Sequence, residues 1–358
     1  MAITKLPIDE FLTLIKHNQV LDVRSPGEFK HAHIPGAISF PLFTDEERKI
    51  VGTAYKQESK QIAVKIGLKY FGKKMVKMVE EVENLQSSFY NLKNNVDPDE
   101  KRVLLHCWRG GMRSAGVAWL LDLYGFKVFT LVGGYKAYRN WVLQQFEKEY
   151  PINILGGFTG SGKTEVLHEL AKTGQQIIDL EGLASHKGSA FGAIGQPPQP
   201  TQEQFENLLA KVLSTIKCDA GSILYLEDES QRIGEVNIPS VLFKQMREKK
   251  VLFLNIPFEE RLNFIVANYG KFKKEELVNA VIRIKKKLGG LETKTAINAL
   301  VEDDVKNCFV VLLQYYDKLY QKGLLKRDQP NLLVQTIECK EVDAAKNAVT
   351  INQLSISK

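Results

Sequence analysis

The stretch INILGGFTGSGKTEVLHEL, residues 152–170, decides the fold of the second half of the chain. It predicts an apolar strand, a glycine-rich turn and a helix, and residues 157–164 match the Walker A pattern in full. Glycines let the backbone of such a loop point its amides at a diphosphate, the lysine neutralises the terminal phosphate, and the threonine hydroxyl binds Mg²⁺. The predicted diphosphate-binding residues are Gly157, Gly160, Ser161, Gly162, Lys163 and Thr164, with Mg²⁺ held through Thr164.

Apolar runs after this loop predict further strands, a pattern typical of a parallel α/β sheet. The predicted strands are residues 176–180, 223–227 and 251–256. Asp179 and Asp228 stand at strand ends, where they are either acids for Mg²⁺ or substrate, or solvated chain. His186 and Lys187 lie in a Gly- and Ser-rich turn and either contact an anion or form plain loop surface. The chain has no Asn-Lys-x-Asp guanine motif, so we do not expect a GTPase.

A second glycine-containing loop occurs earlier, in LLHCWRGGMRS at residues 104–114. An apolar strand precedes Cys107 and a helix is predicted to begin near Ser114, so loop amides and the helix N-terminus form a site for an anion. The same field, with Arg109 and Arg113 nearby, lowers the pKa of a thiol and makes Cys107 a candidate catalytic nucleophile. The alternative is a buried structural cysteine. The predicted anion loop consists of Trp108, Arg109, Gly110, Gly111 and Arg113.

The composition is typical of a globular protein, and 358 residues suit two or three domains. The formal net charge of +7 favours a polyanionic partner. The four cysteines form no CxxC pair, which argues against a metal site or a disulfide framework. Because no apolar run reaches the ~20 residues of a membrane span and the N-terminus lacks an apolar signal core, we expect a cytoplasmic protein with no membrane partner.

Residues 21–37, LDVRSPGEFKHAHIPGA, resemble the N-terminal signature of rhodaneses and of the related dual-specificity phosphatases. Asp22 and Arg24 in this stretch are predicted to form a structural ion pair. Arg113 stands six positions after Cys107, one more than is usual in single-domain rhodaneses and equal to the tyrosine-phosphatase spacing. The loop therefore fits either a phosphatase or a cradle for a phosphate-bearing chalcogen donor such as selenophosphate, and the spacing does not separate the two.

These patterns together predict an α/β protein in which a rhodanese-like domain precedes a P-loop NTPase-like domain with a parallel sheet. The predicted parts are residues 1–146, a rhodanese-like domain with a helical insertion at about 45–93; residues 147–260, the P-loop domain; and residues 261–358, a helical C-terminal region.

A rhodanese-type unit joined to a P-loop unit resembles the bacterial tRNA 2-selenouridine synthases. Blocks similar to that family follow in the same order along residues 21–320, among them HCWRGGMRS, GGYKAYR, DLEGLASHKGSAFG, LEDESQRIG, PFEERL and YYDKLY. One departure is Lys187, where the family pattern has an arginine after His186. The lysine keeps the charge but lacks the bidentate fork, which puts a planar-anion contact there in doubt.

The resemblance implies a transferase that acts on the wobble 2-thiouridine of tRNAs for Lys, Glu and Gln. It implies that the sulfur is first geranylated with geranyl diphosphate, held by the P-loop with Mg²⁺, and is then replaced by selenium from selenophosphate. Cys107 would serve the selenium step, as a carrier or as a nucleophile, and the arginine-lined loop would hold selenophosphate. This order is chemically reasonable, because an S-alkylated sulfur leaves more readily than a thiocarbonyl sulfur.

A tRNA surface is predicted in the basic segment KFKKEELVNAVIRIKKK, residues 271–287. Arg283, Lys286 and Lys287 can share one helical face there, as phosphate contacts or as an ordinary solvated face. Trp108 is a candidate to stack on an anticodon-loop base, or is a packing residue. An apolar slot for a ten-carbon tail has three candidate wall residues, Phe158, Phe191 and Phe205.

Two other functions remain open from the sequence. One is a phosphatase-like cysteine enzyme fused to a P-loop kinase, which release of phosphate from a simple phosphoester, lost in Cys107→Ser, would support. The other is a nucleotide- and RNA-binding regulator without catalysis. Wild-type behaviour of both Cys107→Ser and Lys163→Ala in every activity assay would favour the regulator.

Overall fold

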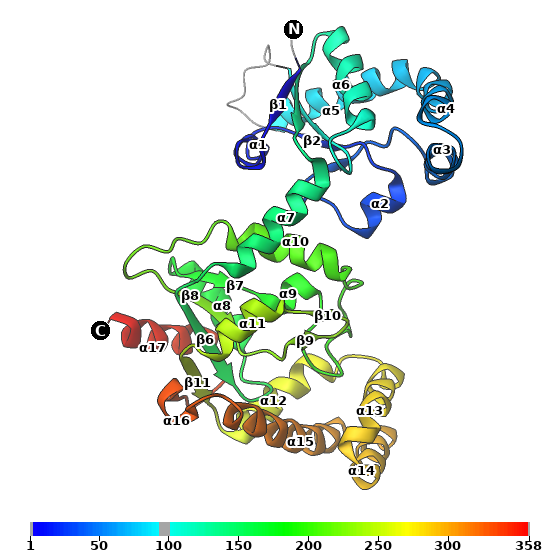
Figure 1. Ribbon diagram of the computed structural model, residues 1–358. Helices are drawn as coiled ribbons and strands as arrows, with labels where there is room; N and C mark the ends of the chain where they lie inside the picture. The colour runs from blue at the N-terminus through cyan, green and yellow to red at the C-terminus, as the bar shows by residue number, and fades with distance from the viewer. Residues whose placement is uncertain (1–2, 93–100, 357–358) are drawn as a thin grey trace. The chain divides into compact units, whose positions relative to one another are not determined.

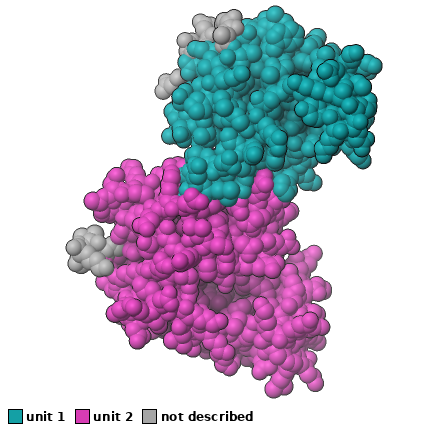
Figure 2. Space-filling view, in the orientation of Figure 1, with its two compact units in different colours: residues 1–145 teal, residues 146–358 magenta. Residues whose placement is uncertain are grey.

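A computed structural model describes residues 3–92 and 101–356, and the chain divides into two compact units (Figure 2). Unit 1 comprises Met1–Gln145 and unit 2 comprises Phe146–Lys358. Both units are built on a parallel sheet with helices, so the predicted α/β class is confirmed. Within the described ranges, no helix is long and apolar enough to cross a membrane.

Unit 1 has a five-stranded, all-parallel sheet with the strand order β1-β5-β4-β2-β3 (Figure 1). Its strands are β1 (Thr4–Leu6), β2 (Val20–Asp22), β3 (Ile38–Ser39), β4 (Arg102–His106) and β5 (Lys127–Leu131). Its helices outside the insertion are α1 (Ile8–Ile15), α2 (Pro26–His31), α6 (Met112–Tyr124) and α7 (Gly134–Glu147). The central strand β4 is almost wholly buried because its apolar run RVLLH faces packed helices on both sides. Parallel pairing brings the carboxyl ends of β2 and β4 to one edge, where Cys107 follows β4.

The predicted helical insertion is present as three helices between β3 and β4. They are α3 (Asp45–Gln57), α4 (Lys60–Gly72) and α5 (Met75–Leu92). A capping box starts α3, because the Thr44 hydroxyl accepts from Glu47 N–H at 3.2 Å and Glu47 accepts from Thr44 N–H at 2.9 Å. Phe71 and Met78 anchor the insertion in the core that also contains β4. The predicted end of the insertion, residue 93, lies outside the described residues.

Unit 2 contains a second five-stranded parallel sheet, with the strand order β12-β11-β6-β8-β7 (Figure 1). Its strands are β6 (Ile152–Gly157), β7 (Gln176–Ile178), β8 (Leu224–Glu227), β11 (Val251–Asn255) and β12 (Val334–Glu338), and a small antiparallel hairpin contains β9 (Arg232–Ile233) and β10 (Val236–Asn237). The helices are α8 (Lys163–Lys172), α9 (Leu180–Ala184), α10 (Gln202–Leu213), α11 (Ser240–Arg247), α12 (Phe258–Tyr269), α13 (Lys274–Leu288), α14 (Gly290–Val301), α15 (Val305–Leu325), α16 (Pro330–Leu333) and α17 (Ala344–Ile356). The glycine-rich turn after β6 lies at the carboxyl edge of this sheet.

The C-terminal region, residues 261–358, is mostly helical, and it also contributes one strand to the P-loop sheet. Strand β12 pairs in parallel with β11, from Val334 opposite Val251 to Glu338 opposite Asn255, and forms the edge of the P-loop sheet. Helix α17 packs on α8, and Asn352 Nδ2 donates to Thr173 Oγ1 at 3.0 Å. The last residues therefore complete the P-loop sheet. The five-residue edge strand VQTIE contains three β-branched residues, a strand signal that the interpretation of this region as helical overlooked.

The helices α12 to α15 lie together at one end of unit 2 (Figure 1) and have their own apolar core. Leu262 of α12, Leu277 of α13 and Leu312 of α15 are all buried in it. Phe191, from the turn after α9, packs into the same core. The helices α12 to α15 thus pack against the turn that follows α9.

Candidate functional sites

The N-terminus of α7 supports the cysteine loop from behind. Tyr135 N–H donates to the Cys107 carbonyl at 2.8 Å, and the following amide donates to the next carbonyl of the loop at 2.9 Å. Gly134 has a φ of +59°, and a Cβ there would lie 2.3 Å from Cys107 O. Gly110 has a φ of +65°, and its Cβ would lie 2.8 Å from Leu131 O. Only glycine permits this close backbone contact, which gives the GGYKAYR block its physical reason.

The thiol of Cys107 is buried and accepts hydrogen bonds from the loop that surrounds it. Ser114 Oγ lies 3.2 Å from Sγ, and Gly111 N–H donates to Sγ at 3.3 Å. Burial raises the pKa of the thiol, but the Ser114 hydroxyl and the amides of Ser114, Arg109 and Gly111 outweigh it, so the pKa of Cys107 lies below its usual value. The expected direction is therefore found, but its cause is these hydrogen bonds rather than the two arginine charges. Ser114 was missed as a functional residue, although a hydroxyl at the first turn after the loop is a readable signal.

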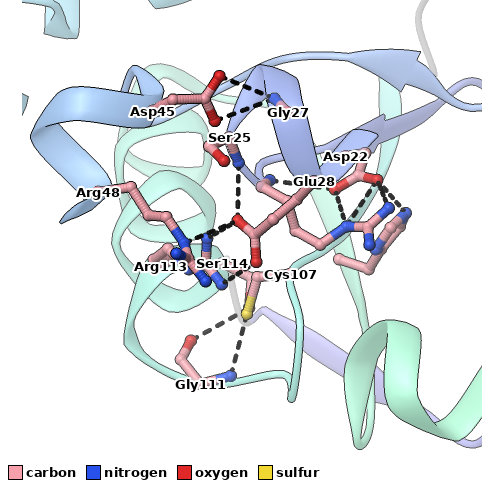
Figure 3. A network of polar contacts seen from close by, with 12 residues as sticks. Asp22, Ser25, Gly27, Glu28, Asp45, Arg48, Cys107, Gly111, Arg113 and Ser114 are labelled. Atoms are coloured by element: carbon pink, nitrogen blue, oxygen red, sulfur yellow. Dashed lines mark hydrogen bonds and ion pairs between the residues drawn. The ribbon is translucent and has the colours of Figure 1, made fainter. Parts of the chain in front are cut away.

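Arg113 does not stand free at the loop, because Glu28 of α2 holds it (Figure 3). Arg113 Nη1 donates to Glu28 Oε2 at 2.7 Å and Nη2 to Oε1 at 3.4 Å. Glu28 also accepts from Ser25 N–H at 3.0 Å and lies 3.5 Å from Arg48 Nε. Burial raises the pKa of Glu28, but Arg113 first and then Ser25 and Arg48 lower it to about 2. No pattern in the sequence pointed to this partner, which lies 85 positions before Arg113. Arg109 remains exposed.

Beneath the loop lies a buried ionic cluster that begins with the predicted Asp22–Arg24 pair. Arg24 Nη2 lies 2.6 Å from Asp22 Oδ2 and donates to Ala32 O at 2.7 Å. The guanidinium stacks on the Tyr135 ring, 3.8 Å from its centroid. His106 Nε2 lies 3.7 Å from the same Asp22 oxygen, and burial lowers the pKa of His106. The Asp22–Arg24 ion pair therefore has a structural role beneath the cysteine loop.

The P-loop of unit 2 curls back through three glycines with positive φ, of which Gly160 (+85°) and Gly162 (+67°) lead into α8. Lys163 Nζ donates to Gly157 O at 3.1 Å, so its ammonium lies folded over its own loop. Ser161 is buried, and its hydroxyl donates to the Phe158 carbonyl. The loop thus has the strand–turn–helix geometry that presents amides and a lysine to a diphosphate.

The acids around Thr164 are glutamates. Thr164 Oγ1 donates to Glu227 Oε1 at 2.6 Å and lies 3.2 Å from Glu181 Oε2. Burial raises the pKa of Glu227 and of Glu181 well above the usual range, and mutual repulsion within the group that includes Glu229 adds to it. Lys163 opposes this effect. The site therefore concentrates more buried carboxylates than its single lysine neutralises.

Asp179 and Asp228, the acids predicted from the sequence, have other partners. Asp179 caps α9, with Gly182 N–H donating to its side chain at 2.6 Å. Asp228 lies 2.6 Å from Arg327 Nη2 and accepts from Tyr320 OH at 2.7 Å. At the end of β8 it is Glu227 of the predicted Glu227-Asp228-Glu229 run that contacts Thr164, because neighbouring strand residues point to opposite faces. Glu181, two residues after Asp179, reaches Thr164 from helix α9.

The C-terminal helices support the P-loop from outside the sheet. Arg261 of α12 is buried, pairs with Asp317 of α15 at 2.8 Å, and donates to the Thr159 carbonyl at 3.0 Å. Tyr320 OH, also from α15, accepts from Gly157 N–H at 3.1 Å. The blocks PFEERL and YYDKLY thus meet at the phosphate loop, although they lie far from it in the sequence.

The turn after α9 contains His186 and Lys187 and lies against the carboxylates. A Cβ at Gly188 would lie 2.6 Å from Glu229 Oε2. His186 is buried, and burial first and the charge of Arg283 second lower the pKa of its ring. Lys187 Nζ lies 5.9 Å from the centroid of the Tyr269 ring. The structure therefore brings Arg283 of α13 into electrostatic range of this turn. Lys286 and Lys287 are exposed on the same helix.

The three phenylalanines predicted to line a prenyl slot pack against other side chains of unit 2. Phe205 is fully buried in α10, and Phe191 packs on Phe309 in the helical core. Phe158 contacts the Phe253 ring edge-on, with centroids 5.1 Å apart. All three therefore take part in packing within unit 2.

Comparison with known proteins agrees with both units. A rhodanese-like domain model matches residues 8–140, and a tRNA 2-selenouridine synthase AAA domain model matches residues 150–348. A tRNA 2-selenouridine synthase of Sulfurovum sp. (strain NBC37-1) is 34% identical, over 87% of this chain and 90% of that protein. Those of Hydrogenovibrio crunogenus and Shewanella piezotolerans are 34% and 32% identical, over 89% and 88% of this chain and 93% and 91% of those proteins.

The fold and its two loops define a transferase in which a rhodanese-like cysteine unit is fused to a P-loop unit. With full-length relatives at this identity, the chain belongs to the tRNA 2-selenouridine synthase family. The resemblance seen in the sequence blocks is confirmed.

Proposed function

We propose that this protein geranylates the sulfur of wobble 2-thiouridine in tRNAs for Lys, Glu and Gln with geranyl diphosphate, and then replaces that sulfur with selenium from selenophosphate. The observation that carries the proposal is the presence of two different anion loops in two units. One loop surrounds a thiol whose pKa is lowered, and the other is a complete phosphate loop. A two-step reaction with two phosphate-bearing co-substrates requires both.

Support for the selenium step comes from unit 1. The buried Cys107 thiol, with Ser114 and Gly111 as hydrogen-bond donors, has a lowered pKa and so favours the thiolate more than an ordinary cysteine does. It acts in the selenium step as a carrier or as the nucleophile that assists loss of the geranyl thiol. The loop amides, with Arg109 and the Glu28-bound Arg113, hold selenophosphate.

Support for the geranyl step comes from unit 2. The loop amides and Lys163 bind the diphosphate. No group of three or more His, Cys, Asp or Glu side chains in the described ranges is arranged to hold a metal alone. Thr164 with Glu227 and Glu181 fits Mg²⁺ that arrives with the diphosphate, because Mg²⁺ binds through one or two carboxylates plus phosphate oxygens. Bound there, Mg²⁺ would offset charge on the leaving diphosphate.

The atoms balance over two transfers. In the first, the 2-thio sulfur bonds to C1 of the geranyl group, the C–O bond to diphosphate breaks, and the base loses the proton of its N3. In the second, selenium from selenophosphate bonds to C2 of the base and the C–S bond breaks, so geranyl thiol leaves. Water then takes the phosphoryl group as inorganic phosphate. Residues of α13, with Arg283, Lys286 and Lys287, bind the tRNA backbone.

Geranyl transfer to thiolated tRNA in nucleotide-free buffer tests this function, followed by addition of ATP as a competitor. We expect transfer without ATP and inhibition when ATP is added, because the P-loop recognises a diphosphate and not a base. Transfer that requires ATP and hydrolyses it with each turnover would overturn the proposal and make the P-loop a nucleotide motor.

A phosphatase fused to a kinase is the second candidate, and the Cys107–Arg113 spacing favours it. Its test is release of inorganic phosphate from a simple phosphoester by the wild type and by Cys107→Ser. We expect no release that depends on Cys107. Stoichiometric release that disappears in Cys107→Ser would establish the phosphatase instead.

A further inference from the structure

A pocket of about 330 Å³ lies beside the cysteine loop in unit 1. Its walls are α2 with its N-cap, the start of α3, and Trp108, the residue after Cys107. Glu28 lines the pocket and also holds Arg113, the last residue of the loop (Figure 3). The pocket and the nucleophile loop therefore share one ion pair. The volume is within the range of small-molecule sites.

Trp108 forms an aromatic wall of this pocket. Its side chain remains 38% exposed, although the Tyr135 ring lies behind it with centroids 5.7 Å apart. The guanidinium of Arg24 lies 5.9 Å from the indole centroid. An indole that is held from behind and open in front is a platform on which a flat ring can stack.

The polar walls carry both signs of charge, with Arg24, His31 and Arg48 beside two acids, and so are not the wholly basic lining that a free polyanion favours. Glu28 and Asp45 both contribute carboxylates, and both oxygens of Asp45 accept from Gly27 N–H at 3.0 Å. Arg48 is 53% exposed, and its guanidinium can bind a further anion beyond its 3.5 Å contact with Glu28. Carboxylates repel a dianion such as selenophosphate, whereas a ring with donors and acceptors on its edge can use them. One phosphate outside the ring can then pair with Arg48.

We propose that this pocket is the subsite for the base that is modified at Cys107, stacked on Trp108, with the adjoining phosphate at Arg48. The ligand is a pyrimidine nucleotide within single-stranded RNA, in which unstacked bases lie open to aromatic side chains. This inference rests on the proposed function, since it names the place where the cysteine unit receives its RNA substrate. Glu28 positions the loop: it orients Arg113 on one side and borders the base on the other.

The experiment uses the full chain and an anticodon stem-loop RNA that carries 2-thiouridine at the wobble position. Binding is followed by fluorescence anisotropy of a dye attached to the RNA, and selenation by nucleoside mass spectrometry. Trp108→Ala raises the Kd and the KM for the RNA about ten- to a hundred-fold, which corresponds to the loss of one stacked base. The KM for selenophosphate stays unchanged. Trp108→Phe restores most of the affinity because a phenyl ring still stacks.

Matched controls come from the same unit. Trp119 on α6 is 51% exposed and does not line the pocket, so Trp119→Ala leaves RNA binding unchanged. Arg48→Ala lowers the salt slope of RNA binding by about one unit, as expected for one lost phosphate contact. Lys49→Ala, an exposed neighbour on α3 outside the pocket, leaves the slope unchanged.

Two results would overturn the subsite. One is an unchanged Kd for the stem-loop in Trp108→Ala. The other is a rise in the KM for selenophosphate alone, which would make the pocket an anion site. Failure of the proposed function looks different: the wild type would form no 2-selenouridine. The fluorescence titration still tests the pocket in that case, because it needs no turnover.

Discussion

The charged groups at the cysteine loop and at the P-loop are compensated to different degrees. At the cysteine loop, Arg113 already has its counter-charge in Glu28, and the thiol has its donors in Ser114 and Gly111. At the P-loop, a single Lys163 faces several buried glutamates whose pKa values are raised. The first loop is preorganised before any ligand arrives, whereas the second has an excess of buried acid. A cation that comes with a phosphate ligand removes that excess, so we expect ligand-dependent behaviour in unit 2 alone.

The largest expected effect is that of Cys107→Ser. It abolishes selenium incorporation and leaves geranylation largely intact, because only the selenium step needs the loop thiolate. The measurement is nucleoside mass spectrometry after incubation with thiolated tRNA, geranyl diphosphate and selenophosphate. Cys218→Ser, at an exposed cysteine far along the chain, is the matched control. Formation of 2-selenouridine at the wild-type rate would remove Cys107 from the mechanism.

Lys163→Ala gives the reciprocal result. Geranyl transfer is lost, since a diphosphate in the loop loses a charge-assisted contact worth about 1.5–3 kcal/mol. The same variant still inserts selenium when it is supplied with tRNA that is already geranylated, because unit 1 is unaltered. Lys172→Ala at the other end of α8 serves as control. Loss of both steps in Lys163→Ala would show that the loops do not act separately.

Ser114→Ala tests whether the hydroxyl, rather than arginine charge, activates the thiol. The thiolate is the reactive form, so the selenation rate rises with pH through the pKa of Cys107. Without the Ser114 hydrogen bond that pKa rises, and the acid limb of the pH–rate profile moves to higher pH. At neutral pH we expect roughly a ten-fold slower selenium step. A pH–rate profile identical to that of the wild type would show that the Ser114 hydroxyl does not lower the pKa of Cys107 and would favour the arginine charges as the cause.

Glu28→Gln removes the negative charge that pairs with Arg113 at the cysteine loop. The pKa of Glu28 in the folded state is about 2, below its ordinary value of 4.5, so its contribution to stability is present above about pH 4.5 and is lost as the pH falls towards 2. The variant should therefore be less stable by roughly 1 kcal/mol at pH 7, and the difference should narrow at pH 4. Urea unfolding at both pH values measures it, with exposed Glu46→Gln as the control. An equal difference at both pH values would contradict the linkage.

The smallest effect belongs to the basic face of α13. Lys286→Ala with Lys287→Ala lowers the salt slope of tRNA binding by up to about 2 units, because each lysine near a phosphate releases about one counterion. Titrations at several salt concentrations decide it. Lys65→Ala with Lys69→Ala, two exposed lysines of α4, form the matched pair. An unchanged slope would leave α13 as a solvated helix.

The features that the sequence predicts well are local. A strand, a glycine turn and a helix follow one another in each loop, so Cys107 and Lys163 are placed by their immediate neighbours. Their environment is not local. Glu28 reaches Arg113 from α2, and Arg261 and Tyr320 reach the P-loop from helices beyond the sheet.

The acids near Thr164 show why a position at a strand end does not by itself predict a side chain's partner. Asp179 and Asp228 end their strands in the sequence, but Asp179 caps a helix and Asp228 pairs with Arg327. Two glutamates contact Thr164 instead. Glu227 is the strand residue directly before Asp228, and neighbouring strand residues point to opposite faces. Glu181 lies two residues after Asp179, in helix α9. Strand β12 was missed for a different reason: it is short and lies among helices, and its pairing with β11, more than 80 residues earlier, is not visible in the local pattern although three of its five residues are β-branched.

Strand β12 also affects how the protein is made. All five strands of unit 1 are synthesised by residue 131, whereas the P-loop sheet receives its edge strand only at residues 334–338 and its last helix after that. A nascent chain on the ribosome therefore contains every strand of the cysteine unit long before the phosphate-binding sheet can close. A chain that ends before β12 leaves the β11 edge open, with unpaired amides and carbonyls that invite association with other chains. A chain that terminates before β12 therefore lacks the complete phosphate-loop sheet although every strand of unit 1 is present.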